Sequence, residues 1–375
     1  MSDPAERILF IPEVIAWGGA ERSFLTLCEW LHDHGLPHRL VLYWDAVGLE
    51  KFARFPLNKT ELNPQHSARH KIAALRRYFR SGPPAQFAPL MSGYQPALHA
   101  TLAGLRGFHC FMHDTESFFD DWDLKKSPGT RLRRAINRRI LHYGLSAGVT
   151  MVSSEFLSRD TFRLYGIRAE MARIGVQPGH FRARPVGERF RMLSVSRVEL
   201  NKRIDWMLQA LHALEGSADR LSRHVDWRLD VVGSGTELEN LSAMSARLGL
   251  ERRVHFTGFV SDEELERLYD AANLFLMPAR QGYGMPALEA LHRGIPIVLH
   301  RESGASDLLL NTPWAKVFDG GPETFAVALR EMVAALCEGH HLKAPLPAVP
   351  TEGEWAERVV RLCGWLPDDS GGSVD

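Results

Sequence analysis

The feature that most constrains the fold is an alternation of short apolar runs with helical patterns, which occurs twice along the chain. In the first half the apolar runs are residues 8–12, 40–43, 108–112 and 148–153, and a helical pattern covers 19–34. In the second half the runs are 191–196, 227–233, 254–258, 274–278 and 295–300, with helical patterns at 204–211 and 236–248. Such alternation is typical of parallel sheets covered on both faces. It predicts an α/β fold with two doubly wound domains.

The length of 375 residues also favours two domains over one. An irregular stretch at 177–185 is typical of a linker, so we predict an N-terminal domain over 1–182 and a C-terminal domain over 183–350. A final amphipathic helix is expected at 351–366, and 367–375 has the composition of a disordered tail. Prolines and histidines interrupt the pattern at 54–100, where the sequence assigns no elements.

Composition narrows the class of protein. Hydrophobic residues make up 45% and charged residues 24% of the chain, which is typical of soluble globular proteins. No run of eighteen apolar residues occurs, and the first residues lack a signal peptide's apolar segment. Four scattered cysteines indicate neither a disulfide framework nor a zinc site. We therefore expect a cytoplasmic protein that binds no nucleic acid.

The net charge of zero hides an asymmetry between the halves. Residues 1–185 hold 25 Lys and Arg against 17 Asp and Glu, and the remaining residues hold 20 against 28. Two basic segments, 70–80 and 131–141, carry apolar residues at helical spacing. Helices of this kind lie on anionic lipid, which predicts peripheral contact with the inner face of a membrane. Ordinary solvated helix faces are the alternative interpretation.

Two features of the first half are candidates for ligand contact. Gly18 and Gly19, in W-G-G-A-E-R, precede a helical pattern, where bare backbone can approach an anion at the helix N-terminus. His113 follows the run at 108–112, so we expect its ring at the carboxyl end of a strand, facing a ligand rather than the core. There it would form a hydrogen bond or transfer a proton. A tight turn and an ordinary loop histidine are the alternatives.

Two cations follow the first apolar run of the second half. Arg197 comes just past the run at 191–196, and Lys202 lies five residues further on. At a strand-to-helix junction such a pair forms an anion site, because Arg bridges two phosphate oxygens and Lys supplies a point charge. The next junction contains G-S-G at 233–235, in which Gly233 is a weaker candidate of the same kind.

The stretch Q-G-Y-G-M-P-A-L-E, residues 281–289, joins a flexible loop to an apolar helix. Gly282 and Gly284 permit unusual backbone angles around Tyr283, and Pro286 suits a first helical turn. The N–H groups of that turn would point at phosphate or sugar oxygens. Glu289 stands among apolar residues, so we expect it to be buried and to need a partner such as a ribose diol.

Together and in this order, the motifs resemble the retaining nucleotide-sugar glycosyltransferases of family 4. They are G-G-A-E-R, the strand-end His113, S-R-V followed by Lys202, V-V-G-S-G, H-F-T-G-F-V-S-D-E-E-L and Q-G-Y-G-M-P-A-L-E-A, and they cover nearly the whole chain. The resemblance implies the GT-B fold: two Rossmann-like domains facing an inter-domain crevice, with the C-terminal helix crossing back to the N-terminal domain.

The resemblance also implies roles for individual residues. Arg197 and Lys202 would clamp the departing diphosphate, and Glu289 would hold the ribose hydroxyls. Gly19 would lie near the phosphates, His113 would contact the donor sugar, and the backbone at Val260 would contact the base. The remaining expected donor contacts are Gly233, Gly282, Tyr283, Gly284, Met285 and Pro286. The N-terminal domain would bind the acceptor.

Two positions depart from the family's usual pattern. Gln281 stands where glutamate is usual, and Arg203 follows Lys202 where glycine is usual. Gln281 keeps a carbonyl oxygen and adds two donors, but it lacks the charge that would stabilise an oxocarbenium-like transition state. Because the family's leaving phosphate is thought to help deprotonate the acceptor, we expect Gln281 to alter donor choice and rate rather than the reaction class. Arg197, Lys202, His113 and Gln281 are the predicted catalytic residues.

The resulting hypothesis is a retaining hexosyltransferase that moves a sugar from a UDP-, GDP-, ADP- or TDP-sugar to an acceptor hydroxyl or amine. The acceptor class stays open among glycans, lipid-linked molecules and small molecules. No metal cofactor is expected, because no D-x-D motif occupies a crevice position and the two cations would take a metal's role. The alternatives are a sugar-nucleotide epimerase or hydrolase, and a non-catalytic binding protein suggested by Gln281. A dehydrogenase lacks its dinucleotide fingerprint here.

Overall fold

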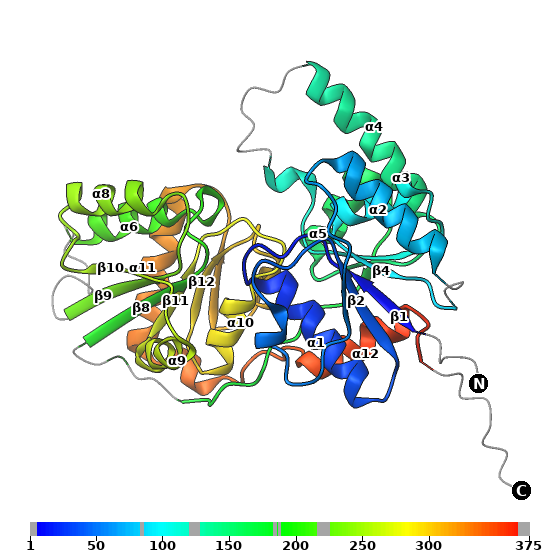
Figure 1. Cartoon of the computed structure of the whole chain (residues 1–375). Helices are drawn as coiled ribbons and strands as arrows, with labels where there is room; N and C mark the ends of the chain where they lie inside the picture. Colours follow the sequence, from blue (N-terminus) through cyan, green and yellow to red (C-terminus); the bar gives the residue numbers. More distant parts are fainter. Residues whose placement is uncertain are drawn as a thin grey trace, which may run out of the picture. The chain divides into compact units, whose positions relative to one another are not determined.

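A computed structural model describes residues 6–82, 86–119, 128–182, 186, 189–215 and 226–366. The chain divides into two compact units: unit 1 comprises Met1–Gly175 with Pro350–Asp375, and unit 2 comprises Val176–Val349. The division falls at Gly175, whereas the sequence placed it at residue 182. The tail predicted at 367–375 lies outside the described residues. Figure 1 shows the elements of both units.

Unit 1 is built on a parallel sheet with the strand order β3-β2-β1-β4-β5-β6-β7. Its strands are β1 (Arg7–Phe10), β2 (His38–Leu42), β3 (Lys59–Glu61), β4 (Leu90–Ser92), β5 (His109–Met112), β6 (Thr150–Val152) and β7 (Glu170–Met171). Its helices are α1 (Gly19–Asp33), α2 (Ala68–Ser81), α3 (Tyr94–Ala103), α4 (Pro128–Leu145), α5 (Glu155–Tyr165) and α12 (Glu352–Leu362). Short 3₁₀ turns occur at η1 (Leu49–Lys51) and η2 (Glu116–Phe119).

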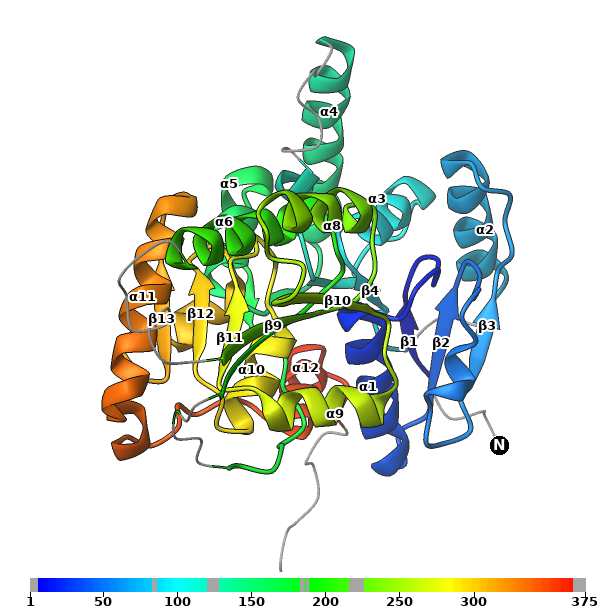
Figure 2. The ribbon, with the colours of Figure 1, turned by 90° about the vertical axis from the view of Figure 1, so that its left-hand side faces the viewer.

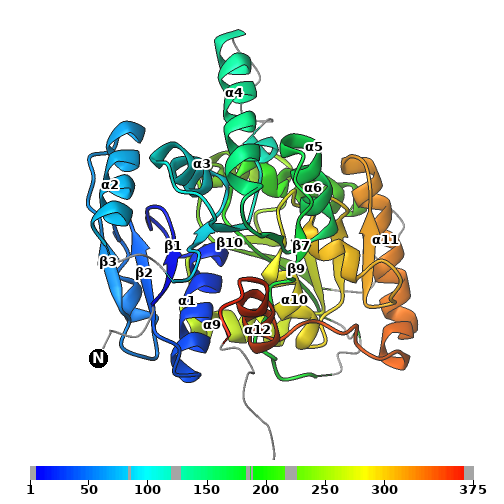
Figure 3. The same ribbon diagram turned by 90° about the vertical axis from the view of Figure 1, so that its right-hand side faces the viewer.

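Both faces of this sheet carry helices, as Figure 3 shows: α1 and α12 cover one face and α3 and α5 the other. The apolar residues of α1 recur at helical spacing, so Phe24, Leu27, Cys28 and Leu31 are all buried against the sheet. The helix ends where Gly35 adopts a left-handed backbone, with φ of 64°.

The C-terminal helix α12 packs on unit 1, far in sequence from the strands that it covers. Thr351 caps it in a capping box with Glu354. Trp355 is buried with its ring 5.6 Å from that of Phe111 in β5. Just past the helix, the Trp365 carbonyl accepts hydrogen bonds from Arg7 of β1 at 2.8 and 2.5 Å. The prediction that the last helix crosses back to the N-terminal domain is confirmed.

Unit 2 has a second parallel sheet with the order β10-β9-β8-β11-β12-β13. Its strands are β8 (Arg189–Val195), β9 (Asp226–Val232), β10 (Val254–Gly258), β11 (Leu274–Met277), β12 (Ile297–His300) and β13 (Ala315–Phe318). Its helices are α6 (Ile204–Glu215), α8 (Leu238–Arg247), α9 (Asp262–Ala271), α10 (Met285–His292) and α11 (Pro322–Glu338). The 3₁₀ turns are η3 (Leu200–Lys202), η4 (Gly304–Leu308) and η5 (His340–Lys343). Figure 2 shows α6 and α8 on one face of the sheet and α9 on the other.

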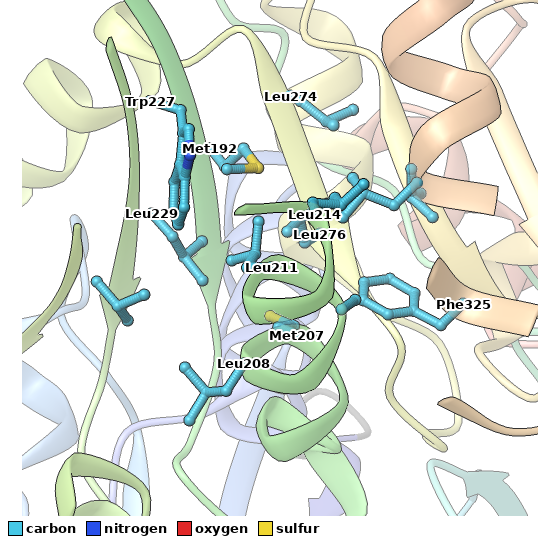
Figure 4. Close-up of a cluster of buried hydrophobic side chains, with 14 of the residues drawn as sticks. Met192, Met207, Leu208, Leu211, Leu214, Trp227, Leu229, Leu274, Leu276 and Phe325 are labelled. Carbon is cyan, nitrogen blue, oxygen red and sulfur yellow. The ribbon is translucent and has the colours of Figure 1, made fainter. Parts of the chain in front are cut away.

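The core of unit 2 is an apolar layer between α6 and the sheet. Figure 4 shows Leu208 and Leu211 of α6 packed towards Leu229 of β9, with Phe325 of α11 alongside. Burying one such leucine contributes about 1.5–3 kcal/mol relative to leaving it in water. This layer fixes the strands whose carboxyl ends carry the residues 196–203, 278–285 and 301–304.

The predicted α/β class with two doubly wound sheets is confirmed. The strands expected from apolar runs all occur, with ends shifted by one or two residues. The unassigned stretch 54–100 contains β3, α2, β4 and most of α3. Within the described ranges, no helix is both long and apolar enough to traverse a bilayer.

Candidate functional site

The residues predicted from the sequence fall into two groups. Gly19 and His113 belong to unit 1, and all the others belong to unit 2. In unit 2 they gather on loops that leave the carboxyl ends of β8, β9, β10 and β11, with the loop after β12 joining them. This edge of a parallel sheet is where doubly wound domains bind ligands.

Lys202 and Gln281, 79 residues apart in the chain, are in direct contact. The Lys202 Nζ donates a hydrogen bond of 2.6 Å to Gln281 Oε1, and Gln281 Nε2 donates one of 3.3 Å to Ser303 Oγ. Burial and the nearby positive charge of Arg197 lower the pKa of Lys202 to about 8, while Glu199 acts in the opposite direction. Lys202 is therefore a desolvated ammonium whose partner is a neutral amide, and its charge is available to an anion.

Arg197 lies on the loop between β8 and η3, and the glycines of the G-S-G motif hold that loop in place. A Cβ on Gly233, whose φ is 128°, would lie 2.0 Å from the Ser196 carbonyl oxygen, and one on Gly235 would lie 2.2 Å from that of Val198. The Val198 N–H donates to the Ser234 carbonyl at 2.9 Å. The glycines thus allow two loops to approach closely, and they leave the Arg197 side chain exposed.

The loop before α10 turns at a single left-handed residue. Gly284 has φ of 108°, and a Cβ there would lie 2.6 Å from Gln281 Nε2 and 3.0 Å from Ser303 Oγ. Gly282 is not left-handed, so only one of the two predicted glycines is needed for its backbone angle. Tyr283 and Met285 are buried, and Pro286 lies in the first turn of α10. Within this first turn the Ala287 N–H donates to the Gly284 carbonyl at 3.1 Å, and Pro286 has no N–H to offer.

Glu289 is half-buried rather than buried as the sequence predicted. The Tyr269 hydroxyl donates to Glu289 Oε2 at 3.2 Å, and Arg293 donates to the Glu289 backbone carbonyl at 2.9 Å. The Arg293 guanidinium also stands 4.6 Å from the centre of the Tyr269 ring. The carboxylate is therefore partly open to solvent, and the hydroxyl of Tyr269 orients it. Nothing in the sequence pattern of α9 indicated this role for Tyr269.

Val260 follows β10 and directly precedes Ser261, the residue that caps α9. It is half-buried, while its neighbour Phe259 is 84% exposed. The backbone here ends a strand at the same edge of the sheet as Lys202, because β10 and β9 are parallel.

In unit 1 the predicted residues occupy different surroundings. Gly19 is exposed at the first turn of α1 and follows Gly18, whose backbone is extended. The His113 ring packs 5.6 Å from Phe24 and 5.0 Å from Phe111, so its Nε2 is buried and has no hydrogen-bond partner among the described residues. Apolar neighbours on α1 and β5 thus pack against the ring, which the sequence did not predict, while the residue as a whole is half-buried. Burial lowers the pKa of His113 to about 4, so the ring is neutral at physiological pH.

Arg203, which follows Lys202, has a left-handed backbone with φ of 53°. This conformation explains why glycine suits the position, since residues with a Cβ adopt it rarely. Its guanidinium forms an ion pair of 2.6 Å with Glu302. Glu302 and Ser303 are site residues that the sequence reading missed, although their place after β12 was a usable signal.

The geometry of unit 2 can stabilise a multiply charged anion. Two cations, an amide and the first turn of α10 converge on one sheet edge, and a carboxylate that can accept two hydroxyls stands one turn away. Among the residues that the structure describes, no group of three or more His, Cys, Asp or Glu side chains is placed to hold a metal ion.

The fold and the site define a class of protein, and comparison with known proteins agrees with it. Residues 179–334 match the family model described as glycosyl transferases group 1. Two parallel doubly wound sheets of this arrangement are the GT-B fold, and structures with that fold match nearly the whole chain. The fold is therefore that of the GT-B glycosyltransferases, as the motifs predicted, and the family match to glycosyl transferases group 1 covers residues 179–334 of this chain.

Among individual relatives, the chain is 28% identical over 245 residues to a GDP-mannose-dependent alpha-(1-6)-phosphatidylinositol monomannoside mannosyltransferase of Mycolicibacterium smegmatis. That match covers 60% of each chain. It is 21% identical to an alpha-monoglucosyldiacylglycerol synthase of Streptococcus pneumoniae, over 60% of this chain and 46% of the relative. The chain thus matches less than two thirds of the length of these relatives.

Two solved structures illustrate the likeness in fold. Sucrose-phosphate synthase from Thermosynechococcus elongatus superposes with a TM-score of 0.70 at 16% identity, covering 96% of both chains. HepE of Anabaena in complex with UDP superposes with a TM-score of 0.67 at 17% identity, covering 96% of this chain and all of that one.

Proposed function

We propose that this protein is a retaining glycosyltransferase of family 4, which transfers a sugar from a nucleoside-diphosphate sugar to an acceptor. The observation that carries the proposal is the contact between Lys202 and Gln281. It holds a desolvated ammonium at the sheet edge with a neutral partner, beside the exposed Arg197. A site with this surplus of positive charge is suited to a diphosphate, and it becomes more favourable as the leaving group gains charge.

Each residue then has a defined task. Arg197 and Lys202 stabilise the departing diphosphate, and a metal ion is not required for that step. Glu289, oriented by Tyr269, accepts the two ribose hydroxyls. The diphosphate takes the acceptor's proton as the new glycosidic bond forms on the same face of the sugar.

Gln281 supports this assignment despite the missing charge. Its carbonyl oxygen orients Lys202, and its amide is fixed by Ser303, so the residue positions a cation without neutralising it. A carboxylate at the same place would neutralise Lys202 in part. We propose that the exchange changes the rate and the donor preference and leaves the reaction class unchanged.

For the donor, we propose GDP-mannose as the first candidate, since mannosyltransferases that depend on it are among the relatives, with UDP-sugars as the second. The acceptor is a hydroxyl compound bound by unit 1.

The experiment is a turnover assay with GDP-mannose, UDP-glucose, ADP-glucose and TDP-glucose, run with and without a mixture of glycan and lipid acceptors. We expect one donor to be consumed only when acceptor is present, with retention of the anomeric configuration. Replacing Arg197 and Lys202 together by alanine should lower turnover by about 10²-fold or more, which is typical when stabilisation of a developing charge is lost. Unchanged turnover in that variant contradicts the proposal.

The acceptor-free arm separates the rival functions. Donor turnover without acceptor supports an epimerase or a hydrolase instead. Activity that appears only after Gln281→Glu supports a non-catalytic binding protein, because it would show that the natural residue disables the chemistry.

We also propose that α4 rests on an anionic membrane surface. Leu132, Ile136 and Tyr143 lie on one face of this helix and are 64%, 49% and 57% exposed, with Arg131 and Arg139 exposed beside them. Figure 1 shows α4 extending past the rest of unit 1. The other basic segment, in α2, exposes cations but no large apolar side chain, so it has an ordinary solvated face.

Co-sedimentation with vesicles tests this contact. We expect binding to vesicles containing phosphatidylglycerol, weak binding to pure phosphatidylcholine, and a loss of about tenfold in binding when Leu132 and Ile136 are both changed to serine. Equal sedimentation of the variant and the natural protein contradicts the proposal.

A further inference from the structure

Arg203 has an unusual backbone for its residue type. It is one of two residues other than glycine with a positive φ among the described ranges, the other being Asn63. A left-handed conformation costs such a residue about 1 kcal/mol or more, and it persists only where surrounding contacts enforce it. Because Arg203 directly follows Lys202, whatever enforces its conformation also determines the position of Lys202.

Three contacts hold the Arg203 side chain. Its Nη2 lies 2.6 Å from Glu302 Oε2, and its Nη1 donates to the Pro278 carbonyl at 3.3 Å. The guanidinium also stands 4.4 Å from the centre of the Trp206 ring. Pro278 precedes the loop of Gln281, and Glu302 lies on the loop after β12. One side chain therefore joins all three loops of the site.

The backbone of these loops is joined at the same points. The Gln281 N–H donates to the Glu302 carbonyl at 3.1 Å, and the Gly304 N–H donates to the Gln281 carbonyl at 3.1 Å. Asn201, beside Lys202, donates through its side chain to the Arg280 carbonyl at 3.1 Å and accepts from the Arg280 N–H through its own carbonyl at 2.9 Å. A shift of Glu302 would therefore shift Gln281, the partner of Lys202.

We infer that Arg203 and Glu302 are positioning residues: their ion pair clamps Lys202 against Gln281 in the geometry that receives a nucleoside diphosphate. The inference deepens the proposed function and rests on it for the identity of the ligand. In this chain the Arg203–Glu302 ion pair sets the position of the Lys202 ammonium, and Gln281, whose side chain contacts that ammonium, is neutral.

Two ways in which the pair can act on Lys202 predict different results. If the pair acts only through its electric field, removing the Arg203 charge raises the pKa of Lys202, and removing the Glu302 charge lowers it. If the pair acts by position, either change loosens Lys202 from its buried place and lets water reach it, so the pKa rises in both variants. The other charged or titratable groups near this cluster are Arg197 and Glu199 on the loop of Lys202, Arg280 on the loop packed against it, and His300 at the end of β12. Arg280 and His300 lie 3.6 and 3.5 Å from Glu302, so Glu302→Gln removes a partner of both, whereas Arg203→Gly does not.

The experiment measures the titration of Lys202 in the ligand-free full chain. The rate of acetylation by limiting acetic anhydride at each pH, read at Lys202 by mass spectrometry, gives its midpoint. The variants are Arg203→Gly, which keeps the left-handed backbone without strain, and Glu302→Gln, which keeps the shape of the side chain. We expect the midpoint to rise by about one unit in both, as Lys202 regains hydration.

The chain offers a matched control elsewhere in unit 2. Arg253 pairs with Glu215 at 2.6 Å, stands 4.9 Å from the centre of the Trp227 ring and donates to a backbone carbonyl at 3.2 Å. Arg253→Ala and Glu215→Gln should leave the midpoint of Lys202 unchanged. Three outcomes overturn the inference. The midpoint of Lys202 shifts in opposite directions in the two clamp variants, it shifts in neither of them, or it shifts equally in the controls.

A second readout separates this inference from the proposed function. Calorimetric titration with UDP and GDP should give an affinity about tenfold lower in both clamp variants than in the natural protein and its controls. If the natural protein binds neither nucleotide, the proposed function fails, while the titration of Lys202 still decides whether the clamp exists.

Discussion

The two units use the same device, a glycine before a helix at the carboxyl edge of a sheet, but they build it differently. Before α10, Gly284 is left-handed, and Gln281, Ser303 and Met277 surround it. Before α1, Gly18 is extended, and a Cβ there would approach only the flexible end of Glu21. Side chains from neighbouring loops thus crowd Gly284, whereas the surroundings of Gly18 are open. The loop of unit 1 is held further upstream, where Trp17 stacks on Phe52 with ring centroids 4.1 Å apart and Glu13 pairs with Lys71 at 2.7 Å. We therefore propose that the loop at Gly284 in unit 2 is preorganised for an anion.

The largest expected effect is on the free energy of unfolding, when the glycine before each helix is changed to alanine. Gly284→Ala should lower the free energy of unfolding by about 1–3 kcal/mol from backbone strain, and by more from the contact with Gln281 Nε2. Gly18→Ala should cost less than about 1 kcal/mol, because its backbone angles are open to any residue. Urea titration of the full chain measures both, and equal losses would remove the contrast between the loops.

The next effect concerns pH. The natural Lys202 has a pKa lowered to about 8, so its ammonium is lost as pH rises through that value, and donor turnover should fall there. Gln281→Glu places an anion beside the ammonium, which favours the charged form and raises the pKa. The alkaline limb of turnover should therefore move upward by about one unit or more. If turnover has the same pH dependence in the natural protein and in Gln281→Glu, the titration of Lys202 does not control the reaction.

The smallest effect tests how finely the unit 2 site is set. Tyr269→Phe removes the hydroxyl that donates to Glu289 and keeps the ring beneath Arg293. Losing one such bond should weaken nucleotide binding by about 0.5–1.5 kcal/mol, or roughly two- to tenfold. The control is Tyr165→Phe in unit 1, which removes a hydroxyl that accepts a hydrogen bond from the Glu116 backbone N–H. This change should leave the nucleotide affinity unchanged. A matching loss in both variants would indicate a general effect of the hydroxyl on folding.

Much of the fold was predictable from the sequence because buried parallel strands must be apolar on both faces. Strands such as β5, β11 and β12 are short runs that are apolar apart from a terminal histidine in β5 and β12, and they stand out from the amphipathic helices between them. A strand without such a run is β3, whose residues Lys59–Glu61 are polar. It is an edge strand, and Lys59 pairs with Asp45, Glu50 and Glu61 in place of an apolar contact.

The site was predictable only in part, for a similar reason. Arg197 and Lys202 follow a strand, and Glu289 lies in the helix after a glycine loop. Each of these positions can be recognised from the residues next to it in the chain. The partner of Lys202, the ion pair of Arg203 and the burial of His113 depend on which strands become neighbours. β11 lies between β8 and β12, so loops that are 79 or 99 residues apart meet, and no local pattern in the sequence carries that information.

The most direct test of the account is a thermal-shift titration of the full chain with GDP-mannose, UDP-glucose, ADP-glucose and TDP-glucose. A ligand that binds only the folded state raises the melting temperature, because it stabilises that state by an amount that grows with the logarithm of ligand concentration, about 2.7 kcal/mol at one hundred times the dissociation constant. We predict a clear rise with one of these donors and its loss when Arg197 and Lys202 are both changed to alanine. No rise with any donor, or the same rise in that variant, would contradict a preorganised diphosphate site in unit 2.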